Sequence, residues 1–84
     1  MSDDKAELQL IGTRMEPSGF FRLGYAEPGD TMPFTLILTP QYVARAIGKT
    51  SFTDIQEYAE QNADKLKAIA TVEKARGFTT CTLE

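Results

Sequence analysis

The sequence predicts a small α+β domain, in which a mainly antiparallel β-sheet carries two or three helices packed on one face. Three observations lead to this prediction. Residues 33–39, PFTLILT, alternate between large apolar and smaller side chains, which is the pattern of a half-buried strand. Three stretches between residues 40 and 76 carry apolar side chains at helical spacing. Residues 78–84 return to a strand pattern, so the predicted helices lie between strands.

Length and charge limit the classes of protein to consider. A chain of 84 residues allows one domain, which we place at residues 6–84 after a disordered tail at residues 1–5. The hydrophobic share of 42% is typical of a globular protein. The net charge is −3 and the nine Lys and Arg are scattered, which argues against binding to nucleic acid.

The strongest strand signal follows a weaker first half. In that half, Leu8 and Leu10 predict a weak strand that ends at Gly12, and residues 13–19 predict a turn region. Residues 20–26 predict an extended segment with a bend at Gly24, and residues 27–30 predict a turn. In the strong strand, Phe34, Leu36 and Leu38 share the expected core face, and Thr35, Ile37 and Thr39 share the opposite face.

Three helices are expected at residues 40–47, 51–60 and 63–76. Pro40 suits a first helical turn and Ser51 suits an N-cap. The expected buried side of the third helix consists of Leu66, Ile69, Val72 and Ala75. In the last strand, Cys81 and Leu83 fall on one face and Phe78, Thr80 and Thr82 on the other.

The sequence offers few groups for catalysis. It has no histidine, the commonest general base and metal ligand, and one cysteine cannot build a zinc site. We therefore expect no enzyme activity, no metal and no cofactor. The carboxylates at the junction of the last two helices are better explained as a solvated helix face; these are Glu57, Glu60 and Asp64. Cys81 is expected to point inward as a small buried apolar side chain.

Two groups of residues are candidates for binding a partner. The first is the outward face of the two best strands, lined by Thr35, Ile37, Thr39, Thr80 and Thr82. Either threonine is present there simply because it favours strands, or helices on one side leave the other face open for docking. The second is the aromatic set Phe20, Phe21 and Tyr25. These side chains either anchor an interface or cover a thin core, and both interpretations stay open.

The location is predicted only by default. Residues 1–10 lack the cationic start and apolar centre of a secretory signal, and no apolar run approaches the ~18 residues of a membrane span. We expect a cytoplasmic protein, with export not excluded.

The stretch GFFRLGYAEPGDTMPFTLILTP, residues 19–40, resembles the start of the activation prodomain of the sedolisins, the kumamolisin-like serine-carboxyl peptidases. The residues in the places of the family's Arg–x–Gly turn, acidic proline turn and strand are Arg22, Gly24, Glu27, Pro28 and the Phe34–Leu38 run. Downstream, residues 52–84 resemble the family's paired helices and second strand. Asn62 departs from the family, which usually has glycine there, and the peptidase with its catalytic residues is missing.

The resemblance implies a prodomain-like or ferredoxin-like domain. Whether this domain lacks the final strand of the family stays open. It also implies a non-enzymatic protein-binding module that inhibits a sedolisin-like peptidase or assists its folding. The alternative is a small self-associating structural or regulatory subunit with no peptidase partner, which forms a homodimer by sheet-edge pairing. We expect neither nucleic acid nor membrane as a partner.

Overall fold

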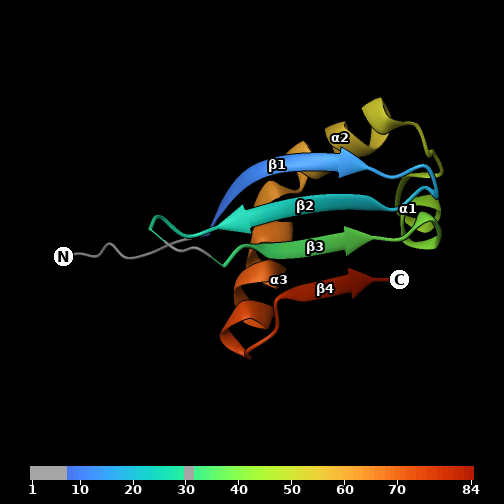
Figure 1. Cartoon of the computed structure of the whole chain (residues 1–84). Helices are drawn as coiled ribbons and strands as arrows, with labels where there is room; N and C mark the ends of the chain where they lie inside the picture. The colour runs from blue at the N-terminus through green and yellow to red at the C-terminus, as the bar shows by residue number, and fades with distance from the viewer. Residues whose placement is uncertain (1–7, 30–31) are drawn as a thin grey trace.

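The computed structural model describes residues 8–29 and 32–84, so the tail expected at residues 1–5 lies outside the described residues. It shows a four-stranded sheet with three helices packed against it (Figure 1). The elements are β1 (Gln9–Met15), β2 (Phe21–Ala26), β3 (Phe34–Leu38), α1 (Pro40–Ile47), α2 (Phe52–Gln61), α3 (Ala63–Ala75) and β4 (Thr80–Leu83). The predicted small α+β domain is confirmed.

The sheet is mixed and its strands follow chain order, β1-β2-β3-β4. The β1–β2 and β2–β3 pairings are antiparallel, and β3–β4 is parallel. The parallel pairing arises because the three helices form a crossover that returns the chain to the same end of the sheet. Along the chain the elements follow the order β-β-β-α-α-α-β, which differs from the β-α-β-β-α-β order of a ferredoxin-like fold.

The core lies between the helices and one face of the sheet. Alternate side chains of the two central strands are buried, and they are Phe21, Leu23, Tyr25, Phe34, Leu36 and Leu38. The helices contribute Val43, Ile55, Ala59, Leu66 and Ala70. Each large apolar side chain buried in this way contributes about 1.5–3 kcal/mol to folding, so this single layer accounts for most of the hydrophobic stabilisation.

Strand β1 is longer than the sequence pattern predicted. It continues through Gly12 to Met15, so the prediction that Gly12 ends the strand is wrong. Hydrogen bonding along β2 stabilises it despite the weak intrinsic preference of its residues. The irregularity expected at Gly24 lies in β1 instead, as a bulge between Leu10 and Gly12. Because β1 ends at Met15, the turn before β2 is shorter than the predicted turn region of residues 13–19. Gly19 lies in this turn with a φ of 96°.

Two of the three candidate anchor aromatics belong to the core. Phe21 is 0% exposed and Tyr25 is 3% exposed, so their assignment as partner-binding residues is wrong. Both lie on the helix-covered side of β2. There the Phe21 ring packs against the ring of Phe52 on α2, with 5.7 Å between the ring centroids. A thin core has recruited them, as the alternative interpretation expected. Phe20 stays half-buried at the start of β2.

Thr39 is a buried capping residue, so its expected place on the outward sheet face is wrong. It is 4% exposed and is the N-cap of α1. Its hydroxyl accepts a hydrogen bond from the Tyr42 backbone N–H at 3.1 Å and donates one to the Leu83 carbonyl at 3.0 Å. The chain leaves the sheet at this residue, which ends the strand alternation, and the hydroxyl ties α1 to β4.

Helix α3 buries a different stripe from the predicted one. Leu66 and Ala70 are buried and Ile69 packs against the core, whereas Val72 is 56% exposed and Ala75 is also exposed. The helix crosses behind the sheet and its C-terminal end passes β4 (Figure 1). Val72 and Ala75 lie on the side of α3 that faces away from Leu66 and Ala70, so the burial predicted for them is wrong.

The double role of Thr39 predicts an unusually costly cap substitution. Thr39→Val keeps the shape but loses both hydrogen bonds, and we expect the free energy of unfolding to fall by about 2 kcal/mol. Ser51 caps α2 at an exposed position, and Ser51→Ala should cost only about 1 kcal/mol. Urea denaturation measures both values. A Thr39→Val loss no larger than the Ser51→Ala loss would contradict the link between α1 and β4.

The tyrosine pair that joins α1 to α2 predicts a loss of stability in alkali. The Tyr42 and Tyr58 hydroxyl oxygens lie 2.8 Å apart. Burial, and then the hydrogen bond to Tyr42, raises the pKa of Tyr58 from 10.0 to about 12. The raised pKa contributes stability that is complete below pH 10 and is lost as the pH rises towards 12, because the unfolded chain ionises first.

Urea denaturation over that pH range tests this directly. Tyr58→Phe should lower stability at neutral pH by about 1 kcal/mol through the lost hydrogen bond, and it should flatten the alkaline decline. An equally steep decline in the variant and the wild type would show that Tyr58 does not cause it.

Candidate functional site

The open face of the sheet, the face without helices, carries a compact set of side chains. It consists of Gly12 and Arg14 on β1, Arg22 and Gly24 on β2, Thr35 and Ile37 on β3, and Thr80 and Thr82 on β4. Their placement follows from strand alternation, because the neighbours of these residues in β2 and β3 are buried against the helices. We use the term open face for this set.

The four β3 and β4 residues lie where the sequence pattern placed them. The parallel register sets Thr35 beside Thr80 and Ile37 beside Thr82. The result is a flat, uncharged half of the open face, in which short hydroxyl side chains surround one apolar side chain. Phe20 lies outside this set, in a hollow at the end of the sheet beside Thr82 and Glu84.

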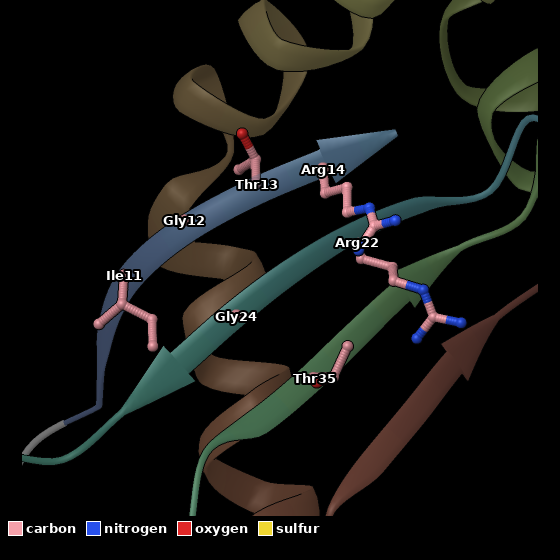
Figure 2. A pocket seen from close by; sticks show the side chains of 7 residues that line it. All are labelled: Ile11, Gly12, Thr13, Arg14, Arg22, Gly24 and Thr35. Carbon is pink, nitrogen blue, oxygen red and sulfur yellow. The ribbon is translucent and has the colours of Figure 1, made fainter. Parts of the chain in front are cut away.

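The other half of the open face is hollowed because two glycines face each other. Gly12 on β1 pairs with Gly24 on β2, and neither brings a side chain to the surface. The hollow has a volume of about 370 Å³ and is lined by Ile11, Gly12, Thr13, Arg14, Arg22, Gly24 and Thr35. Figure 2 shows Ile11 at one end of it and the two arginines towards the other end.

The fold itself does not require these two glycines. The described residues with positive φ are four other glycines, so backbone conformation does not exclude side chains at Gly12 and Gly24. A Cβ added to Gly12 would meet nothing within 4 Å, and one added to Gly24 would lie 3.5 Å from Ile11 Cγ1, an ordinary contact. Glycine inside a strand weakens it and often marks a close approach by another molecule. The hollow is therefore the strongest candidate for a site.

The hollow is basic although the protein is acidic overall. Arg14 and Arg22 lie directly opposite each other across β1 and β2, a placement that is unfavourable for like charges. Glu16 relieves this in part, because its Oε2 accepts a hydrogen bond from Arg22 Nε at 2.6 Å. Within residues 8–29 and 32–84, no carboxylate pairs with Arg14. An acidic group next to an apolar one would match the hollow chemically.

Thr13 shows how the two faces differ on one strand. Its side chain points to the helix side, where its Oγ1 donates to Gln56 Oε1 on α2 at 2.8 Å. This hydrogen bond agrees with the register of β1 on β2, which places the neighbouring Gly12 and Arg14 on the open face.

The groups considered for catalysis show no such organisation. Glu57, Glu60 and Asp64 are all exposed on the helices, as a solvated face would be. Burial raises the pKa of the Cys81 thiol, with a smaller contribution from Glu73, so this thiol is not activated as a nucleophile. The described residues contain no group of three or more metal-ligating His, Cys, Asp or Glu. Within them, no helix is both long and apolar enough to cross a membrane.

Sequence reasoning missed the basic hollow because it ended β1 at Gly12. A usable signal was present in the predicted turn around Pro17 and Gly19. Counting outward from the middle of that turn brings Gly12 opposite Gly24 and Arg14 opposite Arg22, which is the observed register. Treating the turn as the centre of a hairpin would have placed all four on one face.

Comparisons with protein-family models, with curated proteins and with solved structures find no match for the chain in any of the three.

Proposed function

We propose that the chain is a non-enzymatic protein-binding module and that its docking surface is the open face of the sheet. The observation that carries this proposal is the hollow at Gly12 and Gly24. Two strand glycines without a steric reason keep a space open on a face that none of the described helices covers. Such a space lets a partner's side chain or backbone approach the sheet closely.

The chemistry of the open face selects the kind of partner. Arg14 and Arg22 favour an acidic side chain, while Ile11 and Ile37 favour an apolar contact beside it. The threonines between these residues can exchange hydrogen bonds without the cost of desolvating a charge. We therefore infer a protein partner that presents a carboxylate flanked by apolar residues.

A sedolisin-like peptidase is the specific partner we propose, and the module would act on it as a prodomain-like inhibitor or folding chaperone. This step rests on the resemblance of residues 19–40 and 52–84 to sedolisin prodomains. The open face supports it in general terms, since a prodomain must offer its peptidase a broad surface and standard interfaces bury ~800 Å² on each side.

The glycine argument predicts that filling the hollow stabilises the fold. Gly24→Thr adds a strand-favouring side chain in ordinary contact with Ile11, and we expect the free energy of unfolding to rise by about 0.5–1 kcal/mol. Urea denaturation measures this value. A Gly24→Thr protein that is clearly destabilised would show that the fold needs the glycine, and would remove the main support for a binding hollow.

The docking surface predicts a matched pair of binding phenotypes. A sedolisin-type peptidase freed of its own prodomain is assayed for peptide cleavage with micromolar amounts of the chain. The wild type should slow cleavage, whereas Gly24→Thr and Arg14→Glu should each weaken inhibition about ten-fold or more.

Lys49→Glu is the matched control, because it makes the same charge change at an exposed position after α1 and should inhibit like the wild type. No inhibition by the wild type would exclude the peptidase as partner. Equal inhibition by all four proteins would place the docking surface elsewhere.

A further inference from the structure

Strand β4 ends the sheet, and the described part of the chain places no strand on its outer side. The Thr35 N–H donates to the Thr79 carbonyl at 3.0 Å, and the Thr39 N–H donates to the Leu83 carbonyl at 3.1 Å. Successive residues of a strand direct their backbone groups to opposite sides. Thr80 and Thr82 therefore direct their N–H and C=O groups away from β3, to the edge.

The two edges of the sheet differ in how they resist pairing. Strand β1 has a bulge between Leu10 and Gly12 and carries the charge of Arg14, both of which discourage another strand from adding to it. Strand β4, with the sequence TCTL, has no charge, no proline and no bulge. Its edge therefore lacks these protecting features and offers a template for strand addition.

An exposed apolar side chain lies on the helix beside this edge. Val72 is 56% exposed, and its neighbours on the surface of α3 are Ile69 and Arg76. The Phe78 N–H donates to the Glu73 carbonyl at 3.2 Å, so the chain turns from the last turn of α3 directly towards β4. Val72 lies in the last turn of α3 (Ala63–Ala75), and the C-terminal end of that helix passes β4 (Figure 1). A strand added to β4 would therefore lie close to this turn.

We propose that β4 pairs with β4 of a second copy of this chain, antiparallel and about a two-fold axis at Cys81. This register pairs Thr80 with the partner's Thr82 and Thr82 with the partner's Thr80. It thereby uses the outward backbone groups of both residues in both copies. The contact is self-complementary, as a two-fold interface must be, and it extends the two sheets into one of eight strands.

The same register brings opposite charges together beyond the ends of the strands. Glu84 falls opposite the partner's Phe78, since each lies three residues from Cys81 in opposite directions. The Arg76 guanidinium lies over the Phe78 ring, 5.6 Å from its centroid, and so stands close to that position. Glu84 is exposed in the monomer and free to approach it. Arg76 already pairs with Glu73 at 3.2 Å, but its side chain stays 62% exposed, so it can take Glu84 of the second copy as a further acceptor. Together with the self-complementary register, this favours a second copy over an unrelated strand.

Light scattering after size exclusion tests the proposal on the whole chain. The wild type should reach twice its mass of 9.3 kDa as its concentration is raised towards ~1 mM, a range that detects even weak association. Thr82→Pro removes an N–H that faces the free edge and no hydrogen bond to β3, and it should raise the dimer dissociation constant at least about ten-fold. Thr82→Val, which keeps that N–H, should not.

Val72→Lys is a second variant, in case the proline prevents folding. It changes an exposed side chain and should weaken the dimer while leaving monomer stability unchanged. Cys81 reports the register, because a Cα separation of ~4.5 Å across the axis lies within the ~4.4–6.8 Å range of disulfides. Oxidation by copper phenanthroline and oxygen should therefore cross-link wild-type dimers.

A chain that stays monomeric at ~1 mM overturns the proposal. So does a dimer that neither Thr82→Pro nor Val72→Lys weakens, and a dimer that does not cross-link through Cys81 has a different register. Since edge pairing leaves the open face uncovered, these results are independent of the inhibition assay.

Discussion

Strict alternation along β2 and β3 is the constraint on which the rest of the structure depends. Every second side chain in these strands is large and apolar, and all six of these side chains lie on one face. The helices can bury only that face, because the intervening residues include Arg22, Gly24 and Thr35. The open face thus follows directly from the way the core is built.

The small size of the domain strengthens this constraint. An 84-residue chain has enough apolar side chains for one thin layer, and even the aromatics near the turns, Phe21 and Tyr25, are drawn into it. The buried residues of the described part of the chain form one core cluster, and it lies on the helix side of the sheet. The open face and the β4 edge are therefore the surfaces on which the proposed contacts with other chains would bury further area.

The sequence predicted the elements whose signals are local. The PFTLILT alternation, Pro40 in a first helical turn, the cap at Ser51 and the helical spacing predicted β3 and the helices to within a few residues. The predictions from the sequence were wrong where contacts between distant residues determine the structure. Hairpin pairing carried β1 through Gly12, and the position of α3 at the sheet edge left Val72 exposed. Half of the open face was predicted from the β3 and β4 pattern, whereas the basic hollow needed a cross-strand register that periodicity alone does not contain.

The central claim, a sheet covered on one face only, can be measured by the reactivity of single cysteines in a Cys81→Ser background. A thiol reagent should modify Thr35→Cys, half-buried on the open face of β3, directly in the folded protein, at a rate that does not depend on unfolding. The adjacent Leu36→Cys, on the buried face, should react roughly a thousand-fold more slowly, because it becomes accessible only when the domain opens. Equal protection of both thiols would contradict the account, since it would mean that the second face of the sheet is also covered.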